Sequence, residues 1–263
     1  MLSQTTHNQS IIDQFTKQAL PFSQKSALTD EAAFKLMMET CGLTTADNVL
    51  DVACGPGLTA CAFAAVAAHV IGIDLTPAMI ERARVRQVEL GLTNLTWQVG
   101  DVTSLPYNEA AFSLVMTRYA FHHFLAPRVV LAEMKRVCQP GGRVRVIDAA
   151  PARDKADAYN CFEKLRDPSH TRALPPEELS ASLSEAGLVE IETAFYQVEF
   201  ELEKVLGASF PDAGDEERIR QIVLADLGKD SLGMGVHRRA NDVYFFYPTM
   251  ILVGTKPEEK LSR

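Results

Sequence analysis

The sequence has few of the features that mark secreted, membrane-spanning or nucleic-acid-binding proteins. Its five cysteines are odd in number and scattered, with no C-x-x-C pair, which predicts a reducing compartment without a disulfide framework or a structural zinc site. No apolar run reaches the roughly 18 residues of a membrane-spanning helix, and the N-terminus is polar, so we expect neither a signal peptide nor stable membrane insertion. The 26 lysines and arginines are outnumbered by 34 acidic residues, which argues against nucleic acid as a partner. We therefore expect a cytoplasmic protein.

Alternating strand and helix patterns fill the middle of the chain. The 263 residues, 47% of them hydrophobic, suffice for one large domain or a domain with an insertion. Strands that are joined by single helices form a parallel sheet with right-handed crossovers. The sequence therefore predicts an open, doubly wound α/β sheet. The expected strands are 48–51, 69–74, 95–101, 112–117 and 143–148, with helices over 58–68, 76–90 and 127–138 between them.

Two helices are expected before the first strand. Residues 1–10 are polar and are expected to be loose, and apolar positions over 11–20 predict a short helix that Pro21 stops. A second helix is expected over 29–41, with Thr29 as its cap. The two helices form either a lid over a ligand or a cover for a sheet edge.

The regular alternation ends after Asp148. Helices are expected over 152–165, 175–186 and 215–227, and strands over 189–200 and 243–254. An uninterrupted strand pair needs only a short hairpin, but here residues 201–240 separate the two strands. We expect this insertion to be a cap over the active site or an oligomer contact, such as that of a homodimer.

The stretch from Asn48 to Ala60 has the pattern of a ligand-binding turn. A buried strand leads into Gly55-Pro56-Gly57, and a helix of small residues follows. Glycines allow the backbone to approach a nucleotide-like group closely at the N-terminus of a helix. Asp51 precedes the glycines, and its carboxylate would repel a pyrophosphate but suit a ligand with an ammonium group.

Three carboxylates follow neighbouring strands of the predicted sheet. Asp51, Asp74 and Asp101 stand at the carboxyl ends of the first three strands or beside them, and ligands of open α/β sheets bind outside those ends. Asp74 lies about twenty residues after the glycine turn, where an acid can accept both hydroxyls of a ribose. Asp101 can accept from an exocyclic amine such as that of adenine. Each aspartate alone could be a turn or cap residue, but together they predict one binding crevice.

These motifs resemble those of class I S-adenosylmethionine (SAM)-dependent methyltransferases, in the group that includes ubiquinone/menaquinone-type and related small-molecule enzymes. The likeness covers about residues 10–200 and the last strand. Ala53 stands where many relatives have glycine, and Phe22 where relatives often have tyrosine. The motifs that carry the resemblance are 49–57, 72–74, 100–101, 120–124, 140–142 and 166–170.

The resemblance implies a Rossmann-like, seven-stranded, mostly parallel sheet with an antiparallel last strand. It implies a helical lid over 1–45, a core over 46–200 and 241–256, SAM as cofactor, S-adenosylhomocysteine (SAH) as product, no metal, and a small-molecule acceptor. By the resemblance, the methionine part of SAM is bound by Asp51, Ala53, Gly55 and Gly57, and the ribose by Asp74. The adenine is contacted by Leu75, Met79, Gly100, Asp101 and Val102. The wall below the sulfonium consists of Thr117 and Arg118, and the substrate is contacted by Phe22 and Tyr119.

Three histidines are candidate bases for an in-line transfer of the methyl group to O, N or C. His122 and His123 either act in catalysis or only form the pocket wall, and adjacent residues point in different directions, so at most one of the two is expected to act. His170 is a base, a substrate contact or a helix-capping residue. Arg166 either pairs with Asp167 or binds an anionic group of the substrate.

Two other functions also fit part of the sequence. Gly55 to Ala60 satisfies a looser dinucleotide-binding pattern, which would suit an NAD(P)-dependent oxidoreductase. Asp51, Asp101 and the lack of a recognisable hydride-transfer set argue against that function. A non-catalytic SAM-binding scaffold with the same fold is the second alternative.

Overall fold

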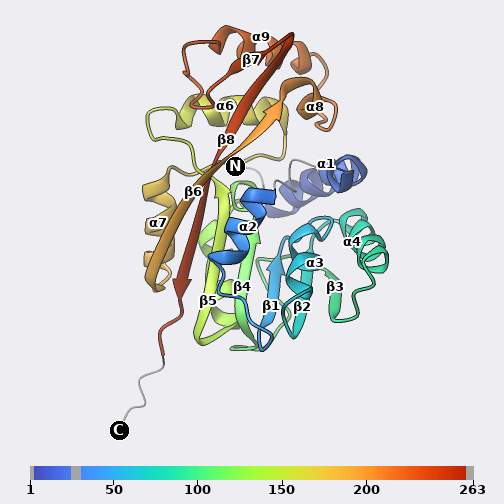
Figure 1. Ribbon diagram of the computed structural model, residues 1–263, viewed down its shortest axis with the longest axis vertical. Coiled ribbons are helices and arrows are strands. Elements are labelled where there is room, and N and C mark those ends of the chain that lie inside the picture. The colour runs from blue at the N-terminus through green and yellow to red at the C-terminus, as the bar shows by residue number, and fades with distance from the viewer. Residues whose placement is uncertain (1–2, 25–30, 259–263) are drawn as a thin grey trace.

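The expected strands lie side by side in one sheet, in the order β3-β2-β1-β4-β5-β8-β6, with β7 paired to β8 (Figure 1). The computed structural model describes residues 3–24 and 31–258. The strands are β1 Asn48–Val52, β2 His69–Asp74, β3 Leu95–Val99, β4 Phe112–Arg118, β5 Cys138–Ala149, β6 Val189–Glu201, β7 His237–Arg239 and β8 Asp242–Thr255. The helices are α1 Gln4–Gln24, α2 Glu31–Glu39, α3 Leu58–Ala64, α4 Pro77–Glu89, the short 3₁₀ helix η2 Phe121–His123, α5 Pro127–Val137, α6 Ala156–Arg166, α7 Pro176–Glu185, α8 Leu202–Leu206 and α9 Asp215–Asp226.

The predicted fold class is confirmed. Strands β1 to β5 pair in parallel, and β8 lies antiparallel between β5 and β6. An eighth strand, β7, was not expected; it has three residues and lies within the segment 201–240. The parallel register aligns the ends of β1, β2 and β3, because Asp51 pairs with Gly72 and Asp74 pairs with Val99.

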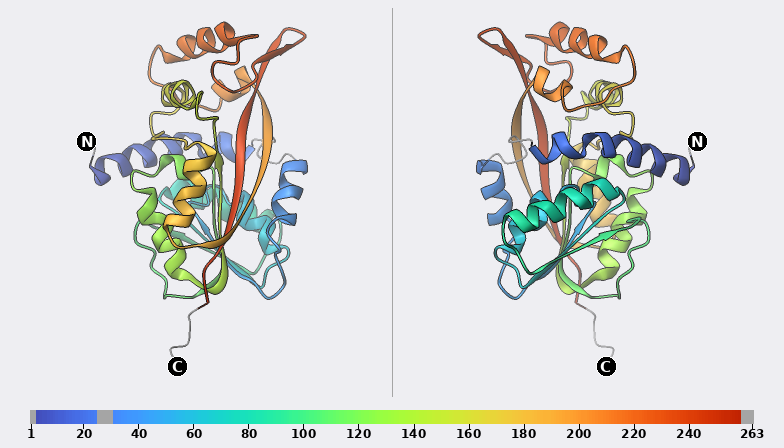
Figure 2. Two further views of the ribbon diagram at one scale, coloured as in Figure 1. Left: turned by 90° about the vertical axis from the view of Figure 1, so that its left-hand side faces the viewer. Right: turned by 90° about the vertical axis from the view of Figure 1, so that its right-hand side faces the viewer.

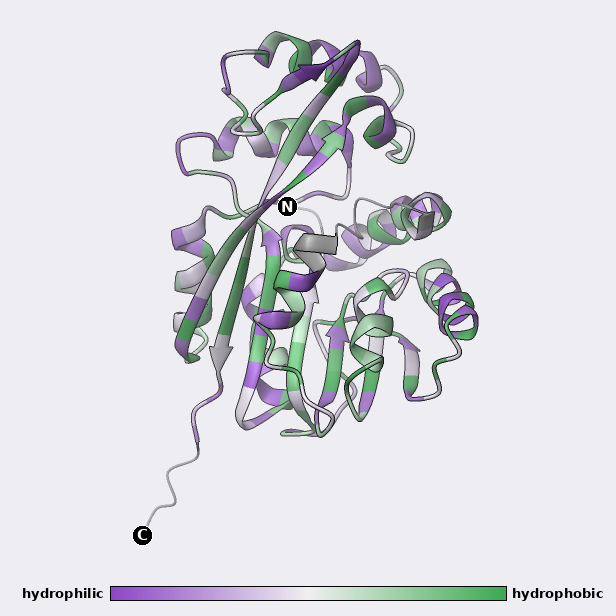
Figure 3. Cartoon of the chain, in the orientation of Figure 1, coloured by the Kyte–Doolittle hydropathy of each residue, from purple (hydrophilic) through white to green (hydrophobic). Residues whose placement is uncertain are grey.

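Apolar strands form the centre of the molecule, and helices cover both faces of the sheet (Figure 3). Leu50 and Val115 are fully buried in the cluster on one face, whereas Val49 and Leu114 are fully buried in the cluster on the other. Successive residues of a strand point to opposite faces, so these adjacent apolar residues serve both clusters. This two-sided burial holds the strand ends, and therefore the predicted crevice, in fixed positions.

The strands β6 and β8 continue beyond the sheet as a two-stranded ribbon that carries the segment 201–240. Residues 249–255 of β8 pair with β5, whereas the earlier residues of β8, down to Tyr244, pair only with β6 or β7. Helices α6, α8 and α9 pack on this ribbon around buried Phe162, Val223 and Phe245. The segment therefore has an apolar cluster of its own. We call the segment 201–240 together with α6 the cap.

Helix α1 is longer than the sequence predicted. Residues 4–10 are helical rather than loose, and Pro21 lies inside the helix rather than ending it. Proline removes one hydrogen bond of the helix, but contacts with α4 hold the last turn, where Arg86 Nη2 donates to the Ser23 carbonyl at 2.9 Å. The predicted cap Thr29 lies outside the described residues.

Several element boundaries also differ from the prediction. Helix α3 ends at Ala64 rather than Ala68, because the Ala68 N–H turns back to the Asp47 carbonyl at 3.0 Å and leads into β2. Strand β5 begins at Cys138, five residues before the expected start. Of the helices in the described part of the chain, none has the length and apolar character needed to cross a membrane.

Candidate functional site

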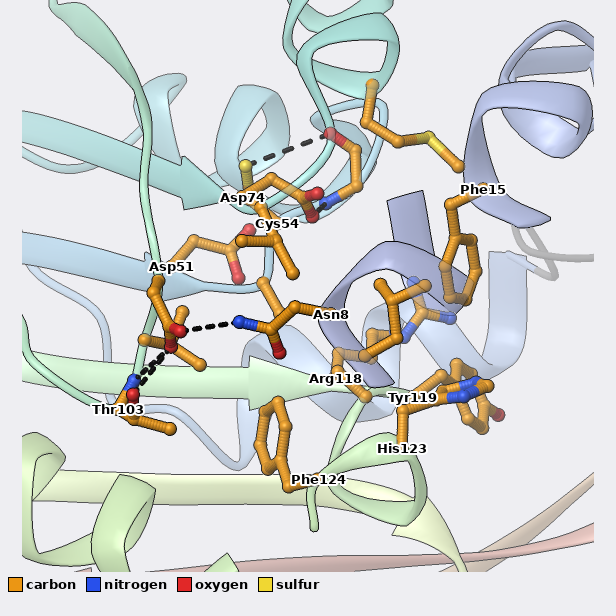
Figure 4. A pocket seen from close by; sticks show the side chains of 18 of the residues that line it. Asn8, Phe15, Asp51, Cys54, Asp74, Thr103, Arg118, Tyr119, His123 and Phe124 are labelled. Carbon is orange, nitrogen blue, oxygen red and sulfur yellow. Dashed lines mark hydrogen bonds between the residues drawn. The ribbon is translucent and has the colours of Figure 1, made fainter. Parts of the chain in front are cut away.

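A pocket opens at the carboxyl ends of β1, β2 and β4, and α1 covers it (Figure 4). Figure 2 shows α1 lying across these strand ends, between the sheet and the cap. The lining comes from five parts of the chain: Gln4, His7, Asn8, Ile11, Phe15 and Phe22 of α1; Asp51, Ala53–Pro56, Leu58 and Thr59; Asp74, Leu75 and Met79; Asp101–Thr103; and Arg118–Ala120 with His123–Ala126.

Three residues of the turn after β1 have left-handed backbone angles. The φ angles of Ala53, Gly55 and Gly57 are 56°, 53° and 75°. At Gly57 a side chain is also excluded by space, because an added Cβ would lie 2.6 Å from the Trp97 ring. The Gly55 N–H donates to Asp74 Oδ2 at 2.8 Å, which attaches the turn to the end of β2.

Ala53 is a strained residue, because alanine disfavours positive φ by about 1–2 kcal/mol. Ala53→Gly is therefore expected to raise the free energy of unfolding by up to about 1.6 kcal/mol, after subtraction of roughly 0.4–1 kcal/mol for the added freedom of the unfolded chain. Urea unfolding measures the change. The matched control is Ala181→Gly on the exposed side of α7, where glycine in a helix should cost about 1 kcal/mol. Equal destabilisation by both substitutions would contradict the strain at Ala53.

Asp51 has an unsatisfied buried oxygen at the pocket wall. Its side chain is 2% exposed, and Oδ2 has no hydrogen-bond partner among the described residues. Burial raises the pKa of Asp51 to about 7; the neighbouring Arg118 lowers it and Asp74 raises it further. A buried carboxylate oxygen without a donor is costly, so the pocket has a place for a cationic donor here.

Asp74 and Asp101 are held by backbone and side-chain donors. Asp74 Oδ1 accepts from the Thr76 N–H at 2.8 Å, and Oδ2 accepts from Gly55. Burial raises the pKa of Asp74 against the effect of these hydrogen bonds. Asp101 Oδ1 accepts from the N–H and hydroxyl of Thr103 at 2.8 and 2.7 Å. All three predicted carboxylates lie along one pocket, as expected from their positions.

Helix α1 supplies pocket residues that the sequence analysis missed. Asn8 Nδ2 donates to Asp101 Oδ2 at 2.7 Å, and His7 Nε2 donates to the His123 carbonyl at 2.7 Å. The signal was present as spacing: His7, Ile11 and Phe15 stand four residues apart, which places them on one face of a helix. The polar composition of residues 1–10 concealed this face.

Three of the predicted cofactor residues do not line the pocket. Thr117 is fully buried in β4, next to Arg118, which does line it. Neighbouring strand residues point to opposite faces, so only one of these two side chains can face the pocket. Gly57 and Gly100 lie outside the lining; the close approach at Gly57 is to Trp97.

The three candidate histidines are close together, but only His123 lines the pocket. The His122 ring lies 4.3 Å from that of His123, and His122 Nδ1 is bonded to Asp148. Burial lowers the pKa of His122, but Asp148 outweighs this effect and the pKa is raised overall. His170 is buried, with Nε2 2.7 Å from Asn160 Oδ1, and burial lowers its pKa. His122 and His170 therefore lie behind the pocket wall.

The residues predicted to contact the substrate do not all line the pocket. Phe22 and Tyr119 line the pocket, and the Tyr119 hydroxyl lies 2.9 Å from Thr249 Oγ1. Arg166 does not line it. The guanidinium is buried and forms an ion pair with Glu163 at 2.5 Å, rather than pairing with Asp167 or facing a substrate. In the described part of the chain, no group of three or more His, Cys, Asp and Glu side chains is placed to hold a metal ion.

The chain is similar to known methyltransferases in sequence and in fold. Residues 50–146 match the sequence model of a family described as "Methyltransferase domain". The chain is 27% identical over 246 residues to YcgJ, an uncharacterized methyltransferase of Bacillus subtilis, covering 92% of this chain and 97% of YcgJ. The crystal structure of YcgJ covers 87% of this chain, and this chain 99% of it, with a TM-score of 0.79.

Two further relatives match over part of their length. The 27-O-demethylrifamycin SV methyltransferase of Amycolatopsis mediterranei is 30% identical over 178 residues, 64% of each chain. The demethylmenaquinone methyltransferase of Clavibacter sepedonicus is 32% identical over 125 residues, which are 47% of this chain and 50% of that protein. The domain match over residues 50–146, the whole-length likeness to YcgJ and the fold that the two structures share support a SAM-dependent methyltransferase.

Proposed function

We propose that the protein binds SAM along the three pocket aspartates and transfers its methyl group to a small-molecule acceptor that enters beside α1. The unpartnered Oδ2 of buried Asp51 is the observation that supports this placement best. The α-ammonium group of SAM would supply the missing donor and compensate the buried charge. Bound SAM supplies a methyl group that is already activated by its sulfonium.

The remaining lining residues suit the other parts of the same ligand. Asp74 accepts the ribose hydroxyls, while Leu75 and Met79 flank the adenine as apolar surfaces. Asp101 and Val102 face the adenine edge. The residues of the chain hold the two reactants in line, and such alignment can supply up to about 7–11 kcal/mol of the acceleration.

A small acceptor is favoured by the apolar wall of the pocket and by the net charge of the chain. The apolar side chains of Ile11, Phe15 and Phe22 form the wall that α1 contributes. The net charge of −8 disfavours a polyanionic substrate. The rifamycin and menaquinone enzymes named above act on small molecules according to their names, and we extend that class of acceptor to this protein.

The pH dependence of ligand affinity tests the role of Asp51. Because its pKa is raised to about 7, Asp51 is mostly protonated at pH 6 in the free protein and must lose that proton to pair with an ammonium group. The affinity for SAH is therefore expected to rise about tenfold from about pH 6 to about pH 8, with proton release on binding. Calorimetric titration measures both, and Asp51→Asn should bind more weakly and without this pH dependence. A parent protein with a flat profile contradicts the placement.

Methyl transfer itself separates the remaining alternatives. With methyl-labelled SAM and a mixture of small metabolites, we expect labelled product and stoichiometric SAH. Binding of SAH without transfer to any acceptor would favour the non-catalytic scaffold. Binding of NAD(P)H without binding of SAH would favour the oxidoreductase and overturn the proposal.

A further inference from the structure

One ring nitrogen of His123 contacts a residue behind the pocket wall, and the other has no hydrogen-bond partner among the described residues. Nδ1 lies 3.1 Å from Ser169 Oγ, in the loop after α6. No hydrogen bond joins Nε2 to any residue in the ranges 3–24 and 31–258, and it is not among the fully enclosed atoms that lack a partner. Since the ring lines the pocket, Nε2 is the polar atom that His123 presents there.

The hydrogen bonds of Ser169 determine which nitrogen carries the proton. Ser169 has one hydroxyl hydrogen, and Oγ donates it to Asp167 Oδ1 at 2.6 Å. Asp167 is ionised and can only accept hydrogen bonds. Burial alone would raise the pKa of Asp167, but the neighbouring His123 and Arg166 and the hydrogen bonds from Ser169 hold that pKa well below its usual range. Its Oδ2 accepts from Gln18 Nε2 at 3.1 Å. Ser169 Oγ must therefore accept from His123, so Nδ1 carries the hydrogen and Nε2 has a free lone pair.

We propose that Nε2 of His123 accepts the proton of a hydroxyl group on a neutral acceptor, and that Ser169 and Asp167 are positioning residues that fix the tautomer. This inference rests on the proposed function. The acceptor oxygen forms its bond to the methyl carbon while the carbon–sulfur bond breaks and sulfur keeps the electron pair. The hydroxyl proton passes to Nε2, and the imidazolium then faces Asp167 through Ser169 until the proton leaves to water.

The environment of His123 favours a hydroxyl over an amine as the acceptor. Burial and the neighbouring His122 lower the pKa of His123 to about 3, against the effects of Asp167 and Asp148. Such a weak base cannot take a proton from an alkylammonium product, whose pKa is about 10. It can take the proton of an oxygen that becomes strongly acidic as the methyl group adds. With an amine as the methyl acceptor, Nε2 would have no proton to accept.

The other two histidines have no comparable free atom at the pocket. His122 is bonded to Asp148 through Nδ1, and His170 to Asn160 through Nε2. His170 Nδ1 is unpartnered but fully enclosed. Their rings lie 4.3 and 6.2 Å from His123, so they shape its surroundings without lining the pocket.

Nitrogen NMR of the ligand-free protein tests the tautomer directly. In protein labelled with ¹⁵N-histidine, we expect long-range ¹H–¹⁵N spectra to show His123 with the hydrogen on Nδ1. Asp167→Ala should weaken this preference, because the Ser169 hydroxyl loses its acceptor at Asp167 Oδ1 and can then donate toward Nδ1. Ser169→Ala should leave a mixture. The matched control is Thr171→Val, which removes a neighbouring hydroxyl that bonds only the His122 and Phe124 carbonyls.

Matched pairs of small aromatic acceptors test the chemistry. With phenol and benzylamine members of each pair, SAH formation is expected from the hydroxyl members, and His123→Gln should slow it by roughly 10²–10⁴-fold. SAH affinity should change less than about threefold, since none of these residues is assigned to the cofactor. An Nε2–H tautomer in the parent protein, or amine turnover that persists in His123→Gln, would overturn the inference. Loss of SAH binding by the parent protein would instead overturn the proposed function.

Discussion

Asp74→Asn is expected to weaken SAH binding at least about 100-fold. Hydrogen bonds to a charged group contribute about 1.5–3 kcal/mol each, and the proposed ribose contact makes two. The substitution also turns an amide NH₂ toward the N–H of either Gly55 or Thr76, both of which now donate to the carboxylate at 2.8 Å. The ribose contact and the position of the glycine turn are therefore lost together. Calorimetric titration with SAH measures the effect.

The control for this prediction is Asp154→Asn, a carboxylate with 76% side-chain exposure before α6. It removes the same charge from the chain without changing the pocket, so its SAH affinity should equal that of the parent. If Asp74→Asn also binds SAH like the parent, the ligand does not lie along the three aspartates. A lowered melting temperature with unchanged affinity would assign Asp74 to the turn alone.

Gly57→Ala is expected to lower the free energy of unfolding by about 2–5 kcal/mol, the sum of overpacking and left-handed strain. The added Cβ would lie 2.6 Å from the Trp97 ring and 2.8 Å from Ala83 Cβ, at a φ of 75°. Gly72 faces the same ring from β2, and a Cβ there would lie 2.5 Å from it. Trp97 therefore fills the space that both glycines leave, and its Nε1 is fixed by Gln87 Oε1 at 2.6 Å.

Urea unfolding with one control and one double variant separates the two causes. Gly91→Ala has a φ of 63° but no heavy atom within 4 Å, so it should show only the strain, about 1–2 kcal/mol. Gly72→Ala has no positive φ and should recover part of its loss when Trp97→Leu is combined with it. Equal losses in Gly57→Ala and Gly91→Ala would show that packing against Trp97 is unimportant.

The parts of the site that local sequence determines were predicted well. The glycine turn and the ends of β1, β2 and β3 depend on apolar runs and glycines that are adjacent in the chain, and parallel pairing then aligns Asp51, Asp74 and Asp101. Ala53 was noted only as a departure from relatives. The structure shows a φ of 56° at this position, which glycine adopts without strain.

The contacts of α1 could not be predicted, because they join residues far apart in the sequence. Asn8 bonds to Asp101, and Gln18 bonds to Asp167, 149 positions away. These polar side chains have no local signature; they resemble those of a disordered segment until their acceptors are known. Pro21 also indicated an end to the helix that the contact of Ser23 with α4 overrides.

The histidines and Arg166 show the limit of motif-based assignment. The sequence placed His170 and Arg166 in one loop beside the expected substrate, and that loop does pass behind the pocket. Which side chains reach the pocket depends on their partners Asn160 and Glu163, both in α6. Asp167, predicted only as a possible partner of Arg166, and Ser169 have the more direct connection to the pocket through His123.

The two faces of α1 contact different parts of the protein. One face lines the pocket, and the other lies along the cap, where Gln14 Nε2 donates to the Phe210 carbonyl at 3.2 Å. Apparent affinity falls in proportion to the fraction of molecules in which a binding wall is in place. A substitution in the cap near Phe210 that weakens the contact with α1 would therefore lower the apparent affinity for the methyl donor, although the substituted residue does not touch that donor.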